Sequence, residues 1–233
     1  MRLTAGTPNR MACAVKIARA AYPSPERRLC YNPPVPELTE RTVERDPIAQ
    51  FSKWYRAARG AVSHLPNAMA LATAAGGRPS VRMVLLKDYG KAGFVFYTNY
   101  DSRKARELGR NARGSLLFHW GELERQVRIE GRIVKVSGGD SDEYFATRPR
   151  GSQLSAWASP QSRTVPGRRL LEARYAASAT RYPGKVPRPP YWGGYRLIPE
   201  AIEFWQGRED RLHDRIRYRR LRKGGWRVER LAP

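Results

Sequence analysis

Short apolar runs recur along most of this chain, separated by glycine-rich or charged residues. The runs are rich in β-branched and aromatic residues, which strands prefer. The runs that we expect to form strands are 67–74, 80–87, 94–99, 114–120, 125–136, 192–197, 201–206, 211–218 and 226–231. Many short strands joined by short turns are typical of an antiparallel barrel. The pattern therefore predicts an antiparallel β-barrel.

A few segments have helical spacing instead. Asp46 and Pro47 suit the N-cap and first position of a helix, and apolar residues then recur at Phe51 and Trp54. The other expected helices begin at Asp101 or Ser102, cover 137–148 with Asp140 as a possible cap, and follow Pro166 and Gly167 to about 182. The predicted fold class is mainly β with flanking helices (α+β).

The first 45 residues differ from the rest of the chain. Residues 1–45 are rich in proline and arginine, so we expect a basic N-terminal segment that is partly disordered or acts as a lid. Arg19 and Tyr22 either fold over a site or lie on the surface. The remaining residues, 46–233, are long enough for a single domain with a full core.

The chain is strongly basic. It has 44 lysines and arginines against 21 acidic residues, a formal net charge of +23. Such an excess favours anionic partners, and nucleic acid has to be considered. The arginines, however, run from Arg2 to Arg230 and are interleaved with acids, without one separate basic block. This distribution argues against nucleic acid as the main partner.

Cysteine usage and hydropathy exclude other classes. The two cysteines, Cys13 and Cys30, show no spacing typical of a metal site, so we expect no metal and a reducing, cytoplasmic location. No run reaches the roughly 18–20 apolar residues that cross a bilayer, and we expect no membrane segment.

The stretch 80–104 predicts a strand, a turn, a second strand and a helix start. Two glycines, Gly90 and Gly93, supply positive φ in the turn. Four cations surround this hairpin and helix start: Arg82, Lys87, Arg103 and Lys104. A helix N-terminus favours an anion because of its free N–H groups and its dipole. The four cations therefore form an anion site or are solvated surface charges.

A second candidate anion site follows the predicted helix over 137–148. Tyr144 and Arg148 are four residues apart and share a face of that helix, which Pro149 ends. Ser152 follows in a predicted loop over 150–153. A phenol, a guanidinium and a hydroxyl in this order suit a phosphate, but the spacing fits an exposed helix end equally well.

The predicted strand 211–218 carries a third group of cations. Alternation places Arg211, His213 and Arg215 on one side, opposite Leu212 and Ile216. If that side faces a cavity, it attracts anions and contains a group that titrates near neutral pH. If it faces water, the cations have no special role.

With these pieces in place, the sequence closely resembles the pyridoxine/pyridoxamine 5′-phosphate oxidase family of flavin enzymes. The matching motifs are Arg-Met-Val-Leu-Leu-Lys (82–87), Phe-Tyr-Thr-Asn (96–99), Ser-Arg-Lys (102–104), Glu-Arg-Gln-Val (124–127), Tyr-Phe-x-x-Arg-Pro (144–149), Gln-Ser (161–162), Trp-Gly-Gly-Tyr (192–195), Glu-Phe-Trp-Gln-Gly (203–207), Arg-Leu-His-Asp-Arg (211–215) and the terminal Glu-Arg-Leu-Ala-Pro. So many motifs in order, over 46–233, make a chance resemblance very improbable.

The resemblance implies an FMN-binding split-barrel homodimer with two FMN sites at the subunit interface. It implies FMN contacts from one chain by Arg82, Met83, Val84, Leu85, Leu86, Lys87, Tyr97, Thr98, Arg103, Lys104 and Gln126, and from the other side of the interface by Gln161, Ser162, Trp205 and Arg215. It implies a substrate site made of Lys87, Tyr144, Arg148, Ser152, Arg211, Leu212 and His213, with Arg211 and His213 as catalytic residues and Arg19 and Tyr22 as a possible lid. The implied reaction oxidises pyridoxamine or pyridoxine 5′-phosphate to pyridoxal 5′-phosphate, uses FMN and dioxygen, and releases hydrogen peroxide.

The chain departs from the family pattern at three places. The lid motif Arg-Arg-x-Tyr is matched only by Arg19 and Tyr22, His64 lies near the position where many relatives carry an acid, and Ser155 replaces a usual glycine. These departures bear on lid closure and turnover rate.

Other hypotheses stay open. The rival classes are a split-barrel flavin reductase that uses a nicotinamide cofactor, and a non-catalytic protein that binds nucleic acid or pyridoxal phosphate. A second anion pocket that binds product near Arg27, Arg28 and Arg230 is a further hypothesis.

Overall fold

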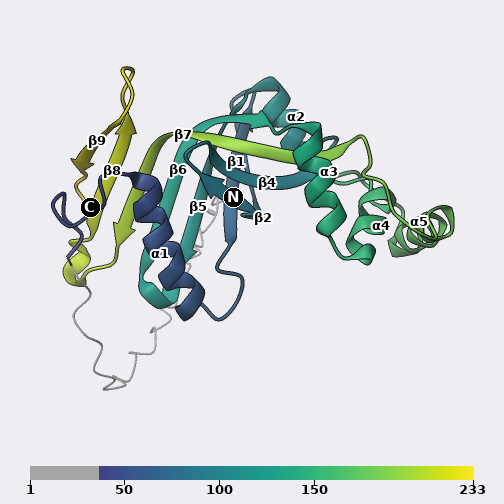
Figure 1. Cartoon of the computed structure of the whole chain (residues 1–233), viewed down its shortest axis with the longest axis horizontal. Helices are drawn as coiled ribbons and strands as arrows, with labels where there is room; N and C mark the ends of the chain where they lie inside the picture. The colour runs from purple at the N-terminus through teal and green to yellow at the C-terminus, as the bar shows by residue number, and fades with distance from the viewer. Residues whose placement is uncertain (1–36) are drawn as a thin grey trace, which may run out of the picture. The chain divides into compact units, whose positions relative to one another are not determined.

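The computed structural model describes residues 37–233, and in them nine strands form one antiparallel sheet (Figure 1). The strands are β1 (Ala68–Ala75), β2 (Arg78–Leu85), β3 (Asp88–Gly90), β4 (Gly93–Asn99), β5 (Arg113–Trp120), β6 (Arg125–Lys135), β7 (Trp192–Gln206), β8 (Asp214–Arg220) and β9 (Trp226–Arg230). The helices are α1 (Pro47–Ala61), α2 (Arg103–Arg110), α3 (Gly138–Thr147), α4 (Arg150–Ala158) and α5 (Arg168–Arg181), with short 3-10 turns η1 (Gly121–Leu123) and η2 (Glu209–Arg211). The predicted mainly β class with flanking helices is confirmed.

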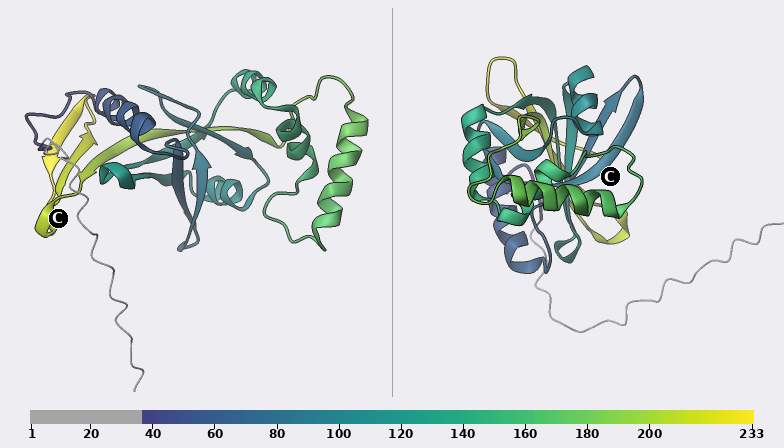
Figure 2. Two further views of the ribbon diagram at one scale, coloured as in Figure 1. Left: turned by 90° about the horizontal axis from the view of Figure 1, so that it is seen from below. Right: turned by 90° about the vertical axis from the view of Figure 1, so that its right-hand side faces the viewer.

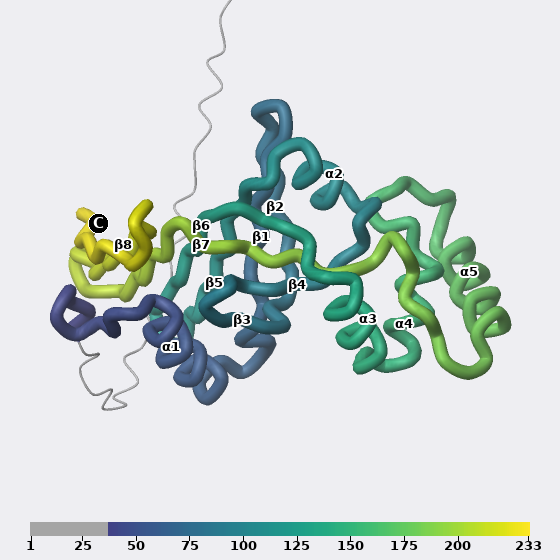
Figure 3. Tube along the Cα trace, turned by 45° about the horizontal axis from the view of Figure 1, so that its top comes forward, coloured from purple at the N-terminus to yellow at the C-terminus, as the bar shows by residue number. Residues whose placement is uncertain are grey.

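Strand β7 connects the two ends of the sheet. It pairs with β6 along most of its length, with β4 through its first half and with β8 through its second half. The remaining order is β2-β1-β5-β6 on one side and β4-β3 on the other, while β9 pairs with β8. Figures 1 and 3 show α3 beside the first half of β7 and α4 and α5 beyond the start of this strand, and the left view of Figure 2 places the C-terminal strands at its opposite end.

Helix α1 closes the apolar core of the barrel. The Asp46 carboxylate accepts a hydrogen bond from the N–H of Ile48 (3.0 Å), so the predicted N-cap is confirmed. The ring of Phe51 is fully buried, and its centroid lies 4.9 Å from that of Phe94. Trp54 makes an edge contact with Phe204 of β7 (5.2 Å). The predicted apolar stripe of this helix is therefore core packing.

The structure has one long strand where we predicted two, over 192–206. Pro199 lies in the middle of β7 and cannot donate a backbone hydrogen bond. The register of β6 against β7 shifts between Glu130 and Gly131, and this bulge carries the pairing past the proline. A Cβ atom on Gly131 would lie 2.0 Å from the Ile198 carbonyl oxygen, so the close approach requires glycine.

The predicted hairpin over 80–104 is wrong in its pairing. Strand β2 pairs with β1 and not with β4, and residues 88–90, predicted as turn, form β3 beside β4. Of the two glycines in this turn, only Gly93 has positive φ (127°). The end of β2 still approaches β4, because the Lys87 N–H donates to the Val95 carbonyl oxygen (2.9 Å).

Two helix starts differ from the predictions. Ser137, not Asp140, caps α3: its Oγ accepts from the Asp140 N–H at 3.0 Å. Residues 150–153 form the first turn of α4 rather than a loop. Pro149 explains why α3 ends and α4 begins at this point. It cannot continue α3, and its fixed φ suits the residue that leads into α4.

The predicted alternating strand over 211–218 begins later than expected. Arg211 ends η2 with a φ of 61°, and β8 starts only at Asp214. Leu212 is 72% exposed whereas Ile216 is fully buried, so these two side chains do not share a face. The buried Asp214 carboxylate anchors the start of β8, since it accepts from Arg208 and from the backbone of residue 38.

Part of the predicted N-terminal segment contacts the barrel. Leu38 is buried, and the Tyr218 hydroxyl donates to the Glu44 carbonyl oxygen (2.6 Å). Arg19, Tyr22, Arg27 and Arg28 lie outside the described residues, so the lid and the second anion pocket remain predictions. Within residues 37–233, no helix is long and apolar enough to cross a membrane.

Candidate active site

A cavity of about 460 Å³ lies where β2, β4, α2 and the α3–α4 junction meet, and we call it the cationic pocket. The residues that line it are Arg82, Met83, Val84, Leu85, Lys87, Tyr97, Thr98, Lys104, Tyr144, Thr147, Arg148, Pro149, Ser152 and Gln161. All except Thr147 and Pro149 were candidate site residues in the sequence. The fold thus brings three of the four cations of the first predicted anion site, and all three residues of the second, into one cavity.

Lys104 is the most buried cation of the cationic pocket. Its Nζ donates to the Gln161 Oε1 (2.8 Å), the Thr98 Oγ1 (3.0 Å) and the Ser102 Oγ (3.3 Å). Burial and, to a smaller extent, the charge of Arg82 lower the pKa of the Lys104 amine to about 8, although the nearby Glu107 carboxylate opposes the change. The amine is therefore mostly charged at pH 7 and surrounded by oxygen atoms.

The N-terminus of α2 adds backbone donors beside Lys104. Ser102 is the N-cap residue, as predicted, but its side chain makes no capping hydrogen bond to the helix. The first-turn N–H groups therefore have no side-chain acceptor from their own cap, and they are suited to an anion.

Arg82 is tied into the protein by four hydrogen bonds. Its Nη1 donates to the Leu71 carbonyl oxygen (3.0 Å) and the Thr73 Oγ1 (2.6 Å). Its Nη2 donates to the Ser80 Oγ and to the Glu107 Oε2 (3.0 Å). These bonds account for four of the five N–H groups of a guanidinium. Arg82 is a half-buried, oriented cation rather than a solvated surface charge.

Aromatic rings stack at the cationic pocket, and two of them, Tyr97 and Tyr144, line it. The rings of Tyr97 and Tyr144 stack with their centroids 4.0 Å apart, and Trp192 stacks on Tyr97 at 5.5 Å. The Arg148 guanidinium carbon lies 4.6 Å from the Trp192 ring centroid. The Arg148 Nη1 is buried and has no hydrogen-bond partner among the described residues. A buried unpaired donor is costly, so this atom marks a position for an acceptor of a ligand.

The three residues of the third predicted group lie with three further candidates near the other end of β7, and we call this set the second cluster. It consists of Gln126, Trp205, Arg211, Leu212, His213 and Arg215, none of which lines the cationic pocket. Gln126 is opposite Trp205 in the β6–β7 ladder, and Trp205 is opposite Arg215 in the β7–β8 ladder. The rings of Trp205 and His213 lie 4.5 Å apart. The Arg215 Nε donates to the buried Glu203 carboxylate (2.8 Å).

The second cluster is far from the cationic pocket in the same chain. Tyr97 of the pocket pairs with Gly194, whereas Gln126 pairs with Trp205, eleven residues later on β7. At about 3.3 Å per residue, roughly 36 Å of strand separate the two positions. The expected grouping also changes: Gln161 lies in the cationic pocket and Gln126 in the second cluster, the reverse of what the resemblance implied.

Three candidates lie outside both groups. Leu86 is buried in the main apolar core. Arg103 is exposed at the start of α2 and donates to Glu107 (2.8 Å), and Ser162 is exposed with a φ of 68°. Glu107 was not singled out in the sequence, although its i,i+4 spacing from Arg103 was a signal.

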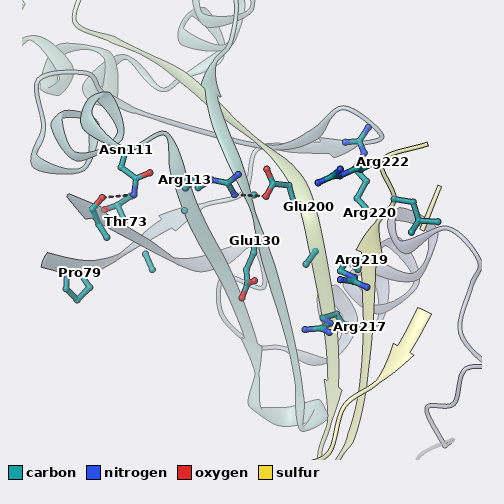
Figure 4. Close-up of a pocket in the computed structure, with 16 residues that line it drawn as sticks. Thr73, Pro79, Asn111, Arg113, Glu130, Glu200, Arg217, Arg219, Arg220 and Arg222 are labelled. Atoms are coloured by element: carbon teal, nitrogen blue, oxygen red, sulfur yellow. Dashed lines mark hydrogen bonds and ion pairs between the residues drawn. The ribbon is translucent and has the colours of Figure 1, made fainter. Parts of the chain in front are cut away.

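A larger cavity contains none of the candidates (Figure 4). This groove of about 1000 Å³ crosses the sheet, and arginines of β5 and of the β8–β9 hairpin line it. Figure 4 shows Arg113 turned toward Glu200, with which it forms an ion pair (2.6 Å). Arg217 and Arg219 pair with Glu229 outside the groove lining. Arginine content alone therefore does not identify the candidate site.

The fold is an antiparallel split barrel, and its cationic pocket suits a ligand that carries a phosphate. A pyridoxamine 5′-phosphate oxidase-related, FMN-binding protein from Nostoc punctiforme has the same fold, with a TM-score of 0.64 at 17% identity over 79% of this chain and 96% of that protein. Residues 57–182 match the family described as pyridoxamine 5′-phosphate oxidase, and residues 192–233 match its C-terminal dimerisation region. The chain belongs to the pyridoxamine 5′-phosphate oxidase family.

Individual relatives agree with this assignment. Pyridoxine/pyridoxamine 5′-phosphate oxidase of Cupriavidus taiwanensis is 56% identical over 84% of this chain and 93% of its own length. The protein of the same name from Rubrobacter xylanophilus is 58% identical over 84% and 91%. PhzG of Burkholderia lata, solved with tetrahydrophenazine-1-carboxylic acid, has a TM-score of 0.80 at 34% identity and covers 85% of this chain and 99% of its own.

Proposed function

We propose that this protein oxidises pyridoxamine and pyridoxine 5′-phosphate to pyridoxal 5′-phosphate, with FMN as cofactor, dioxygen as oxidant and hydrogen peroxide as the second product. The observation that carries the proposal is the cationic pocket, in which two separate sets of phosphate-binding side chains lie together. The names of relatives at 55–58% identity support it.

The residues present suit the phosphate of FMN on the α2 side of the pocket. Lys104 already binds the side-chain oxygens of Thr98 and Gln161, which shows that its amine is placed for oxygen acceptors. Arg103 and the open N-terminus of α2 add charge and N–H donors. When bound, FMN supplies the redox chemistry by accepting a hydride equivalent from the substrate.

The α3–α4 side of the cationic pocket suits the phosphate of the substrate. Lys87, Tyr144, Arg148 and Ser152 line this side, and the Nη1 of Arg148 lacks a partner among the described residues. Charge-assisted bonds to a phosphate would satisfy this donor and fix the substrate ring in one orientation. Pyridoxamine and pyridoxine 5′-phosphate carry the same phosphate, so one phosphate-binding site serves both substrates.

We propose further that two copies share each site. The chain carries the dimerisation region of its family over 192–233. Val81 and Met83 of β2 and Leu212 of the second cluster are 69%, 63% and 72% exposed, and exposed apolar side chains beside a site are typical of an interface. In this arrangement the second cluster of one copy faces the cationic pocket of the other. Arg211 and His213 then orient the substrate and stabilise charge that develops during its oxidation.

A visible spectrum of the purified protein tests the function. We expect a flavin band that bleaches when pyridoxamine 5′-phosphate is added without air and that returns with air. A flavin band that is unchanged by pyridoxamine and pyridoxine 5′-phosphate but bleaches with a reduced nicotinamide cofactor would indicate a flavin reductase. Bleaching by a reduced phenazine carboxylic acid alone would indicate a PhzG-like oxidase. A protein without a flavin band, even after addition of FMN, would contradict the proposal.

The location of the protein is a separate proposal. We propose the cytoplasm, because a chain with only two cysteines suits a reducing compartment. Fluorescence microscopy of the tagged full-length chain in its host cell tests this.

A further inference from the structure

A carboxylate lies at the centre of the cations beside the proposed FMN phosphate site. The Glu107 Oε2 accepts hydrogen bonds from the Thr73 hydroxyl (2.6 Å), the Ser80 hydroxyl (2.6 Å) and the Arg82 Nη2 (3.0 Å). Its Oε1 accepts from the Arg103 Nε at 2.8 Å. One side chain of α2 thus connects strands β1 and β2 to the first residue of its own helix.

This position is unfavourable for anion binding by charge alone. Glu107 is only 11% exposed, and a negative charge near a phosphate repels it. The carboxylate is nevertheless firmly ionised: burial would raise the pKa of Glu107, but hydrogen bonds from Ser80, Thr73, Arg103 and Arg82 outweigh burial and lower the pKa to about 2. The residue therefore needs a role that offsets the repulsion.

The geometry supplies such a role. Arg82 and Arg103 come from different elements, and the charge of Arg82 disfavours the charged form of the buried Lys104, which Glu107 favours. Glu107 receives one N–H from each arginine on a different oxygen atom, so it fixes both guanidinium groups at once. A long side chain that is fixed in advance loses less conformational entropy when it binds a ligand.

We propose that Glu107 is a positioning residue for the flavin phosphate: it holds Arg82 of β2 and Arg103 of α2 in the orientation in which they meet that phosphate. The inference rests on the proposed function, because it takes FMN as the ligand. Glu107 does not line the cationic pocket and acts through Arg82, which lines it, and through Arg103, which precedes Lys104 in the sequence.

The test compares FMN with riboflavin, which lacks the phosphate. Glu107→Gln keeps the size of the side chain and removes its charge. The dissociation constants of both flavins are measured by quenching of flavin fluorescence, with melting temperature as the measure of folding. The matched control is Glu172→Gln on α5, which removes an i,i+4 ion pair with Arg168 (2.7 Å) of the same type.

We expect Glu107→Gln to raise the Kd of FMN about tenfold or more, because a charge-assisted orientation is lost, while the Kd of riboflavin stays within about twofold. Glu172→Gln should change neither. In a double-mutant cycle, Glu107→Gln and Arg103→Gln should be non-additive for FMN. If Glu107→Gln does not fold, Thr73→Val removes one donor to the carboxylate and should weaken FMN binding in the same direction by a smaller factor.

Results that contradict the role of Glu107 can be distinguished from results that contradict the proposed function. An equal loss of FMN and riboflavin would assign Glu107 a general structural role, and an unchanged or tighter FMN affinity would show that its charge only repels. Either result would overturn the inference and leave the proposed function standing. A wild-type protein that binds FMN no better than riboflavin would overturn both.

Discussion

The side-chain oxygen of Gln161 lies 2.8 Å from the Nζ of Lys104. The same oxygen accepts from the Thr98 hydroxyl (3.1 Å), so it occupies the amine that we propose for the FMN phosphate and the hydroxyl beside it. The contact joins the loop after α4 to the start of α2, across a sequence distance of 57 residues. The cationic pocket therefore depends on segments that only the folded chain brings together.

Lys104 predicts a pH dependence of FMN binding. Its pKa is lowered to about 8, so the amine is charged below pH 8 and neutral above it. A phosphate binds the charged form, and the affinity for FMN should therefore fall as the pH rises. We expect the Kd of FMN to be up to about tenfold larger at pH 9 than at pH 7, because each pKa unit corresponds to one factor of ten. Titrations at both pH values measure this.

Riboflavin and a variant provide the controls for that experiment. Riboflavin should show little change between pH 7 and pH 9. Lys104→Met should bind FMN weakly at pH 7 and lose the pH step. A step of equal size in Lys104→Met would assign the titration to another group.

A variant of Arg148 should weaken substrate binding without weakening FMN binding. Arg148→Gln removes the guanidinium whose buried Nη1 has no partner among residues 37–233. We expect the KM for pyridoxine 5′-phosphate to rise about ten- to a hundredfold, because a charge-assisted hydrogen bond contributes about 1.5–3 kcal/mol. The Kd of FMN should stay within about twofold. Steady-state kinetics and flavin titration measure the two quantities.

Arg169→Gln is the control for loss of charge, since Arg169 is an exposed residue of α5 outside the cationic pocket. It should leave both quantities unchanged. If Arg148→Gln weakened substrate binding and FMN binding to the same extent, it would argue against a separate site for the substrate phosphate.

Two impaired variants should complement each other if two copies share the site, when activity is measured at a substrate concentration well below the KM of Arg148→Gln. Arg148→Gln damages the cationic pocket and Arg211→Ala damages the second cluster, which lie at opposite ends of β7. A mixed dimer then contains one intact site and one doubly damaged site. Random association gives about half mixed dimers, so we expect about one quarter of the wild-type activity after co-expression.

The separate variants set the baseline for this complementation. Arg211→Ala alone should lose far more turnover than FMN affinity. Co-expressed variants that remain as inactive as either parent would show that each chain forms its own complete site.

Gly131 of β6 faces the bulge in β7, where Glu200 is the extra residue, and substitution of this glycine tests the close approach. Gly131→Ala places a Cβ atom 2.0 Å from the Ile198 carbonyl oxygen, so the backbone must shift. We expect a loss of about 1–3 kcal/mol in the free energy of unfolding, the usual cost of overpacking. Gly109→Ala, in helix α2 with open space around its Cα, should instead stabilise by up to about 1 kcal/mol. Urea denaturation of the two variants measures both values, and a neutral Gly131→Ala would contradict the close approach.

Local sequence signals predicted most elements. Asp46, Pro47 and the apolar spacing after them predicted α1, because capping and helical periodicity depend on neighbouring residues. Gly76 and Gly77 form the turn between β1 and β2 with positive φ, and a Gly-Gly pair between two apolar runs is likewise a local signal. The predictions failed where distant pairing decides the structure: β6 carries β7 past Pro199, and Asp214 delays the start of β8.

The sequence by itself determined the β-rich class, the family motifs and the cations that candidate chemistry requires. Only the tertiary structure decided how these cations are grouped. Lys104 and Gln161 meet in one pocket, Gln126 lies with Trp205 at the far end of β7, and Glu107 joins Arg82 to Arg103. The physical reason is that side-chain type and local spacing are encoded in short segments, whereas sheet register and packing decide which of those segments become neighbours.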